Sequence, residues 1–532
     1  MIVQRLTTLF SKRNLNPLVV MMLVIIGVGL FKNIDYFPVP NPDVFQYIED
    51  SQYYWSLEFP RNIHASPANP LLIGLLEKIT PDFAFKEVRL AIGINIVAAL
   101  AAAYLFWKIS WQQIGSWAIF PFAMLLTHPV FYLVALNPTS EVLFASVTMA
   151  AFYSLLKKKT GWAYFWSAVS FLVRYEGLVV WLALVVVDLL KLPQNRKSQE
   201  FKVFLVNAGK AFAVMLFWTA VVLIYNNQQK IAGSVYFQEV MERGGLLPDW
   251  SVLESYPNAV FYSSYSLGGK EDWQHVIVYL LTIGGISLSL FQRKLRKENN
   301  YFWPSTFVFV AGYIIFHIGF PAWDIRYLFP IQFFGYLYCY LFLWNLWKVT
   351  QHKKKGFVRL IVGFIIGMLS LLTITNNFSR IEGLMSWGSE GYLENRLAAS
   401  WLRKHYADKQ ALVITLQPWI TSYYTDLPHL IFRLPVGYVG QQTFPCEDID
   451  CIFRYTKAFD PNIDILLIRD NYTHAAGLND FNAQNFGVGF LQNFLKEKQH
   501  YVLLDRVEQE KSWVEIYQYS PNFNWQQNLP KN

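Results

Sequence analysis

Charged side chains are scarce in this sequence. Asp, Glu, Lys and Arg make up 15% of the 532 residues, whereas a soluble globular chain carries about 25%. Hydrophobic residues make up 54% of the chain, and its mean hydropathy is +0.25. Because the apolar residues also recur in long runs, the composition excludes an ordinary soluble globular protein and predicts a polytopic membrane protein.

Cysteine is also scarce, with three residues in the whole chain. Cys339 lies inside an apolar run and is expected to be an inert buried thiol. Cys446 and Cys451 lie in the polar C-terminal region, where no second cysteine pair exists to complete a four-ligand zinc site. If this region is extracytoplasmic, Cys446 and Cys451 are candidates for a small disulfide loop.

The first apolar run, residues 17–31, has no convincing small-residue cleavage site before the acidic loop that follows it. We therefore expect a retained first helix rather than a cleaved signal peptide. Internal repeats and low-complexity tracts are not evident, and neither are the inverted halves that mark many secondary transporters.

Long apolar runs are what the sequence has in abundance. A crossing takes about 20 apolar residues, and by that rule the chain contains about eleven transmembrane helices. The first is expected within residues 17–31, and the others at 87–107, 115–135, 139–156, 162–174, 177–190, 205–225, 273–291, 303–320, 328–347 and 357–375.

Basic residues set the expected orientation. The net charge of +8 could indicate a nucleic-acid partner, but the lysines and arginines lie in short clusters between the apolar runs. These clusters follow the positive-inside rule for a cytoplasmic N-terminus in the plasma (inner) membrane. We therefore expect membrane lipids and no nucleic acid as partners, with residues 33–86, 226–272 and everything after 376 on the outer side.

Residues 376–532 differ in composition from the rest. They are polar, with short β-like runs at 411–415, 463–468 and 501–504, and an alternating run at 514–519. Helical patterns at 395–406 and 490–498 precede the first and third of these runs. The alternation predicts a small extracytoplasmic α/β domain after a membrane domain that spans residues 1–375.

The first outside loop, residues 33–86, contains carboxylates interleaved with aromatic residues. If Asp43 begins a short helix, Tyr47 at i+4 and Asp50 at i+7 lie on the same face of that helix as Asp43. That face could hold a carboxylate at the rim of a membrane cavity. The alternative is a solvated loop whose aromatic residues lie at the headgroup level.

Other polar residues are expected at the same outer end of the membrane domain. Glu141, Arg174 and Arg326 come from three separate turns between apolar runs, and polar groups at membrane depth are costly enough to suggest function. Plainer interpretations stay open. Arg174 could pair with Glu176, Arg326 could pair with Asp324, and Glu141 could be only a favourable charge at a helix N-terminus.

The order of these features resembles the GT-C class of membrane glycosyltransferases, which includes protein O-mannosyltransferases and aminoarabinose transferases. The class has an acidic residue followed by tyrosine at i+4 in the first outside loop, as in Asp43-Val-Phe-Gln-Tyr47. Later motifs also match it: a Pro-Leu-rich segment (residues 68–76), a Ser-Glu pair that opens a helix (140–141), Arg-x-x-Gly (174–177) and Arg-Tyr-x-x-Pro (326–330). The match spans most of the chain.

The resemblance implies a mostly α, GT-C-like fold and an inverting glycosyltransferase that uses a polyprenyl-phosphate sugar donor. Asp43 is then the expected base, with Asp50 as the second choice. Arg326 and Arg174 are expected to bind the donor phosphate. The residues Glu141, Tyr47 and His64 are expected to position substrate, and Glu141 and His64 could also hold an optional divalent metal ion.

One departure from the class leaves the metal open. The class often has adjacent acids or Asp-x-Asp in the first loop, whereas Val44 follows Asp43 and Ser51 follows Asp50. The sequence also leaves open whether the acceptor is a lipid, a glycan or a protein. The competing hypothesis is a non-catalytic membrane subunit or a lipid or solute transporter that uses the same cavity.

Overall fold

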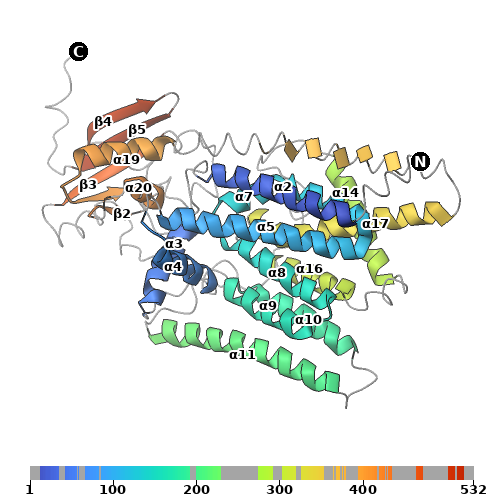
Figure 1. Cartoon of the computed structure of the whole chain (residues 1–532). Helices are drawn as coiled ribbons and strands as arrows, with labels where there is room; N and C mark the ends of the chain where they lie inside the picture. The colour runs from blue at the N-terminus through green and yellow to red at the C-terminus, as the bar shows by residue number, and fades with distance from the viewer. Residues whose placement is uncertain are drawn as a thin grey trace. The chain divides into compact units, whose positions relative to one another are not determined.

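The computed structural model describes the chain in segments (Figure 1). The described residues are 12–34, 42–56, 66–82, 86–191, 199–228, 273–291, 302–318, 325–352, 393–415, 418–425, 429–433, 463–470, 501–509 and 512–519, with residues 58 and 427 and short stretches between 363 and 381. The candidate site residue His64, the acid Asp324 and the disulfide candidates Cys446 and Cys451 lie outside them.

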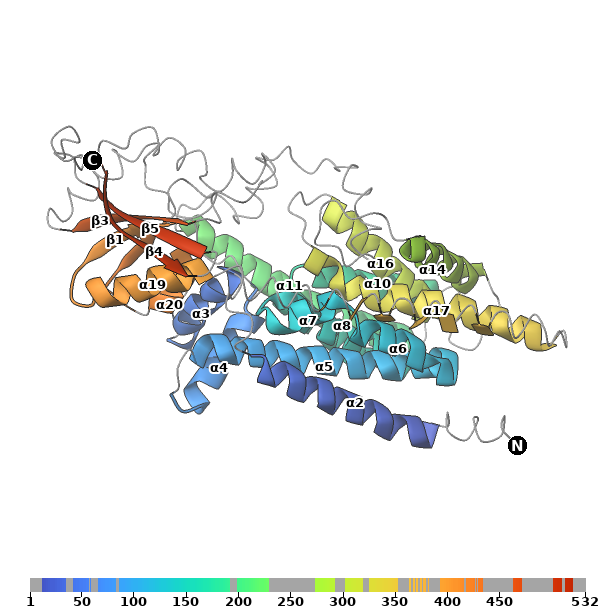
Figure 2. The same ribbon diagram turned by 90° about the horizontal axis from the view of Figure 1, so that it is seen from above.

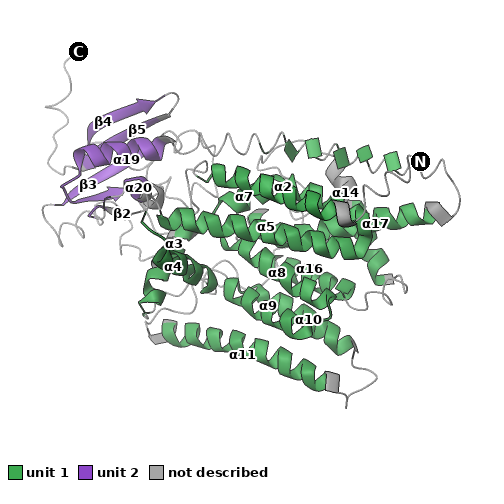
Figure 3. Cartoon of the chain, viewed as in Figure 1, with its two compact units in different colours: residues 1–37, 43–385 green, residues 38–42, 386–532 purple. Residues whose placement is uncertain are grey.

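The chain divides into two compact units (Figure 3). Unit 1 comprises residues 1–37 and 43–385, and unit 2 comprises residues 38–42 and 386–532. Most of the helices belong to unit 1, and the strands belong to unit 2.

Apolar helices make up unit 1, which confirms the predicted mostly α membrane fold. Helices lie in most of the predicted spans: α2 (Lys12–Lys32), α5 (Lys86–Ile114), α8 (Ser140–Leu156), α9 (Thr160–Val173), α10 (Gly177–Lys191), α11 (Gln199–Gln228), α14 (Trp273–Phe291), α16 (Phe302–Ile318) and α17 (Phe329–His352). Within the described residues, four helices are long and apolar enough to cross a membrane, or five if one bent pair counts as a span. The protein is an integral membrane protein, and the number eleven stays a prediction.

The predicted span at 115–135 is not one helix. It consists of the 3₁₀ turn η1 (Gly115–Ala118), α6 (Ile119–Leu126) and α7 (Pro129–Leu136), which pack against α5. Gly115 has φ +62°, a conformation that glycine adopts without steric cost. His128 then caps α7, since its Nδ1 accepts a hydrogen bond from the Val130 N–H (3.2 Å), and Pro129 occupies the first turn.

A second break follows immediately. Helices α7 and α8 are bent by 110° across Asn137–Thr139. Asn95 of α5 holds this corner, because its Nδ2 donates to the backbone carbonyls of Val134 (3.1 Å) and Asn137 (2.9 Å). The break places Ser140 and Glu141 in the first turn of α8, as the sequence predicted.

The segment between α2 and α5 contributes two short amphipathic helices, α3 (Pro42–Trp55) and α4 (Ala68–Ile79). Val44 of α3, Ile73 of α4 and Ala91 of α5 form a buried cluster. The Trp55 Nε1–H donates to the Leu71 carbonyl at 3.1 Å, which ties the end of α3 to α4. The helix predicted to begin at Asp43 is therefore present.

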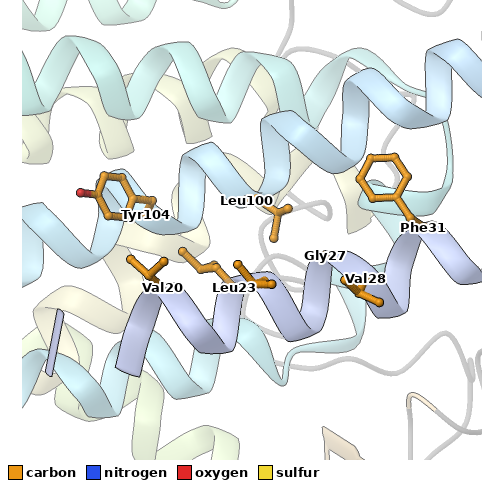
Figure 4. Close-up of a pocket in the computed structure, with 8 residues that line it drawn as sticks. Val20, Leu23, Gly27, Val28, Phe31, Leu100 and Tyr104 are labelled. Carbon is orange, nitrogen blue, oxygen red and sulfur yellow. The ribbon is translucent and has the colours of Figure 1, made fainter. Parts of the chain in front are cut away.

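An apolar groove runs between α2 and α5, which lie side by side (Figures 1, 2 and 4). This open groove has a volume of about 370 Å³ and is lined by Val20, Leu23, Val24, Gly27, Val28, Phe31, Leu100 and Tyr104. Several of these side chains are exposed, including Val24 at 58%. Large exposed aliphatic groups on a membrane helix are the surface that lipid tails cover.

Unit 2 contains a five-stranded mixed sheet of order β2-β1-β3-β5-β4. Strands β2 (Ile431–Arg433), β1 (Ala411–Ile414) and β3 (Asp464–Asp470) are parallel, and β5 (Ser512–Tyr519) and β4 (Tyr501–Gln509) are added antiparallel. The buried core of one face joins α19 (Leu393–His405) to the sheet through Leu402, Leu466 and Ile516.

The strands expected near 411, 463, 501 and 514 and the helix expected at 395–406 are confirmed. Strand β2 and helix α20 (Pro418–Thr425) are additions that the sequence did not indicate, because both are too short for a periodic pattern. The helix expected at 490–498 lies outside the described residues.

Candidate functional site

A cluster of charged side chains lies where several helices of unit 1 begin or end. Glu141 comes from the first turn of α8, Arg174 and Glu176 come from the connection between α9 and α10, and Arg326 comes from η3 (Ile325–Leu328). Glu141 is 1% exposed and Arg326 is 8% exposed. The structure therefore brings Glu141, Arg174 and Arg326 together from turns that are far apart in sequence.

Arg174 is at the centre of this cluster. Its Nη1 donates to Glu141 Oε1 (2.8 Å) and Ser140 Oγ (2.9 Å), and its Nε (3.0 Å) and Nη2 (2.6 Å) both donate to Glu176 Oε1. A guanidinium has five N–H groups, so the Arg174 side chain commits most of its donors to protein atoms. The pairing of Arg174 with Glu176, considered from the sequence, is present together with a second pairing to Glu141.

Arg326 approaches the same carboxylate from another side. Its Nε lies 3.7 Å from Glu141 Oε1, and its Nη2 donates to the Tyr327 hydroxyl at 3.3 Å. The Tyr327 ring lies 5.2 Å from the Arg174 guanidinium carbon and 5.1 Å from that of Arg326. At this separation the ring quadrupole attracts both cations.

Helix α3 is connected to the cluster through two hydroxyl groups. The Tyr47 hydroxyl donates to Ser140 Oγ at 3.3 Å, and Ser140 Oγ also accepts from Arg174. Asp43 is in the first turn of α3, one helical turn before Tyr47. The helix that carries the candidate base thus has a direct hydrogen bond to the residue next to Glu141.

Asp50 also belongs to α3 and is 3% exposed. It interacts with the phenol of Tyr54, one turn further along the helix, and Tyr54 interacts with Tyr175 and Tyr225. Burial, and then the Asp50 carboxylate, raise the pKa of Tyr54 above its usual value, so this hydroxyl stays protonated. Tyr175 is the residue between Arg174 and Glu176, which places the aromatic group beside the charge cluster.

His317, at the C-terminal end of α16, is a neighbour that the sequence analysis did not single out. Its Nε2 lies 3.8 Å from Glu176 Oε1, and its ring stacks on Tyr327 with centroids 5.8 Å apart and planes 13° apart. Only 2% of the residue is exposed. The signal in the sequence was a single ionisable side chain near the end of an apolar run, which is a costly position at membrane depth.

Each carboxylate of the described cluster lies beside an arginine: Glu141 contacts Arg174 and Arg326, and Glu176 contacts Arg174. Burial alone would raise the pKa of Glu176, but the Arg174 guanidinium outweighs burial and holds the pKa of this carboxyl below its ordinary value. Within the described parts of the chain, no group of three His, Cys, Asp or Glu side chains is arranged to hold a metal ion. A divalent ion at Glu141 and His64 stays a prediction, because His64 is outside the described residues.

Gly177 sets the geometry of the Arg174 turn. A Cβ at this position would lie 2.1 Å from the backbone nitrogen of Phe171 and 2.4 Å from the carbonyl carbon of Ser170. These are backbone atoms, so the connection between α9 and α10 would have to move. The close approach explains why glycine follows Arg174, Tyr175 and Glu176 in this turn.

We expect Gly177→Ala to lower the unfolding free energy by about 1–3 kcal/mol, as overpacking does, and to impair activity by displacing Arg174. Gly209→Ala on α11 is the control, because an added Cβ there meets nothing within 4 Å. Unfolding by sodium dodecyl sulfate in mixed micelles measures both. Equal stability of the two variants would show that the turn tolerates a side chain.

The sequence matches no protein-family model and no curated protein. The structure is similar to the crystal structure of ArnT from Cupriavidus metallidurans bound to undecaprenyl phosphate, with a TM-score of 0.52, 12% identity, and coverage of 93% of this chain and 97% of that chain. The chain has the fold of ArnT.

The apo structure of the same ArnT gives a TM-score of 0.51 at 11% identity over the same shares of the two chains. ArnT is an aminoarabinose transferase of the GT-C class. The similarity to ArnT covers both the helical part and the C-terminal sheet of this chain, and it confirms the GT-C fold that the order of motifs indicated.

Proposed function

We propose that this protein is a glycosyltransferase that moves a sugar from a polyprenyl-phosphate donor to an acceptor hydroxyl at the outer face of the membrane. The observation that carries the proposal is the buried contact of Arg326, Glu141 and Arg174 in a chain with the ArnT fold. ArnT was crystallised with undecaprenyl phosphate, which supports a donor of this chemical class.

The proposed reaction is a direct displacement at the anomeric carbon. The acceptor oxygen forms a bond to that carbon while the bond from the carbon to the phosphate oxygen breaks, and the polyprenyl phosphate leaves with the electron pair. The acceptor proton goes to a carboxylate acting as general base. Attack from the side opposite to the leaving group inverts the anomeric centre.

We assign the base to Asp43, with Asp50 as the second candidate. Both are on α3, seven residues apart, and therefore on similar sides of the helix. The hydrogen bond from Tyr47 to Ser140 supports Asp43, because it holds the neighbouring turn of α3 against the charge cluster. Asp50 is buried beside Tyr54, which supports a role in shaping the substrate cavity if Asp43 is the base.

The two arginines have different contacts and therefore different proposed roles. Arg174 donates four hydrogen bonds to Ser140, Glu141 and Glu176, so we assign it chiefly to positioning this cluster. Arg326 is held less tightly to Glu141, at 3.7 Å. We assign Arg326 to the donor phosphate, whose growing negative charge a guanidinium can stabilise with two parallel hydrogen bonds.

The orientation follows from the charge pattern of the loops. The lysine-rich turn Lys157–Lys159, between α8 and α9, is at the opposite end of α9 from Arg174. By the positive-inside rule we assign this turn to the cytoplasmic side, and the charge cluster at the other end of α9 to the outer side.

The experiment that tests the function is incubation of purified protein with a panel of polyprenyl-phosphate sugars and a membrane lipid extract, followed by mass spectrometry. We expect one donor to give a product heavier by one sugar residue. Transport of the donor across a sealed vesicle without any new product would favour the transporter instead.

Arg326→Ala is expected to weaken donor use, because it removes a charge-assisted contact to the phosphate that contributes about 1.5–3 kcal/mol. This corresponds to roughly 10- to 150-fold in the donor KM at 25 °C. Arg326→Lys keeps the charge without the planar fork and should recover part of the loss. An unchanged donor KM in Arg326→Ala would show that Arg326 does not bind the donor phosphate.

A further inference from the structure

His317 is a buried imidazole in the charge cluster that the proposed reaction does not use. Its Nε2 has no hydrogen-bond partner among the described residues and faces Glu176 Oε1 at 3.8 Å. A charge-assisted hydrogen bond between these atoms would measure about 2.7–2.9 Å. The geometry would therefore allow the imidazole nitrogen to take up a proton and then move closer to form a hydrogen bond with the carboxylate.

The charge balance of the cluster explains why a proton would be taken up when a phosphate binds. Glu141 and Glu176 carry two negative charges and Arg174 and Arg326 carry two positive charges, so the charges of these four residues sum to zero. A donor phosphodiester adds one negative charge to this neutral group. Burying a charge without a compensating one is strongly unfavourable.

The surroundings of His317 can stabilise an imidazolium once the phosphate has arrived. Its own helix α16 ends at Ile318, and the C-terminal end of a helix favours positive charge. The Tyr327 ring stacks on it from η3, and the Tyr313 ring lies 4.5 Å away between centroids on α16. Burial of the imidazole disfavours the added charge, and Arg174 also opposes it, while the carboxylates of Glu176 and Glu141 attract it.

We propose that His317 takes up a proton from solvent when the phosphate of the lipid-linked donor binds. This inference rests on the proposed function and adds a positioning residue to it. The proton on Nε2 is donated to Glu176 Oε1, which now shares its negative charge between His317 and Arg174. The hydrogen bonds from Arg174 Nε and Nη2 to Glu176 Oε1 are thereby weakened, and these two donors can turn toward the phosphate.

The test is calorimetric titration of the purified full-length protein with a short-chain polyprenyl methyl phosphodiester. This probe carries one fixed charge, unlike a phosphomonoester, whose second pKa is about 6. Titration in two buffers of different ionisation enthalpy at about pH 7.5 counts the protons that are taken up. We expect about one proton per bound probe, and an affinity that falls as the pH rises because protonation is linked to binding.

His317→Gln is the decisive variant, because its amide can still donate to Glu176 but cannot titrate. It should bind the probe with no proton uptake and with affinity that is independent of pH. His128→Asn is the matched control, since it replaces another buried histidine and retains a helix-capping side chain. It should take up the same proton as the unmodified protein, and thermal melts establish that both variants are folded.

The outcomes separate this inference from the function on which it rests. Binding without proton uptake, or uptake that persists in His317→Gln, would overturn the role of His317 and leave the glycosyltransferase assignment standing. If the unmodified protein does not bind the probe, both the inference and the phosphate assignment fail. Loss of binding in folded His317→Gln without any uptake in the unmodified protein would mean that the residue is purely structural.

Discussion

Asp43→Asn is expected to stop sugar transfer while leaving folded protein in the membrane. General-base assistance contributes about 10²- to 10⁴-fold to rate, and the amide cannot accept the acceptor proton. The loss should appear in kcat, with little change in the donor KM, because Arg326 is assigned to the phosphate. The measurement is turnover of the lipid-linked sugar that the donor panel identifies.

Glu49→Gln is the control for this prediction. Glu49 is on the same helix, and residues adjacent in sequence do not share a helix face. We expect near-normal turnover. If Asp50→Asn loses activity and Asp43→Asn keeps it, the base is Asp50, and the account of the Tyr47 contact would have to be revised.

Arg174→Ala is expected to destabilise unit 1 by about 3–5 kcal/mol, which is the typical effect of removing one partner from a buried ion pair. The change leaves the Glu141 and Glu176 carboxylates facing each other across the space that the guanidinium filled. Unfolding by sodium dodecyl sulfate in mixed micelles measures the loss. A decrease below about 1 kcal/mol, the range of exposed ion pairs, would contradict the buried cluster.

The double variant Arg174→Ala, Glu176→Gln separates charge from packing. If the unpaired charge causes the loss, removing one carboxylate should restore part of the stability, whereas a cavity effect would persist. The pH dependence gives a second control. With Arg174 present the pKa of Glu176 is held low, so its contribution is present above the ordinary pKa of glutamate and lost as the pH falls. The stability gap between unmodified protein and Arg174→Ala should therefore narrow toward acid pH.

The sequence predicted the meeting of Glu141, Arg174 and Arg326 because each is a charged side chain in a short turn between apolar runs. Such turns alternate between the two membrane faces, and the lysine clusters predicted that the other turns form the cytoplasmic face. The residues that decide how the cluster works were harder to predict. Ser140 and Tyr327 were visible only as parts of motifs, and their hydrogen bonds depend on side-chain geometry.

Two structural features were not predicted from the sequence, for different reasons. The run at 115–135 is continuously apolar, so its periodicity did not reveal the breaks at Gly115 and Pro129 that divide it into three short elements. His317 was overlooked because a single histidine in an apolar run is usually a satisfied core residue. Its significance comes from Glu176, which is 141 positions away in the sequence but 3.8 Å away in space.

The most direct measurement is single-turnover release of free polyprenyl phosphate from a polyprenyl-phosphate sugar, with the protein reconstituted in nanodiscs and a membrane lipid extract as acceptor. The account predicts that release accompanies the appearance of one glycosylated product, that both are lost in Asp43→Asn, and that Arg326→Ala requires more donor. Release at the same rate in all three proteins, or binding of every donor with no release at all, would contradict a catalytic site at this cluster.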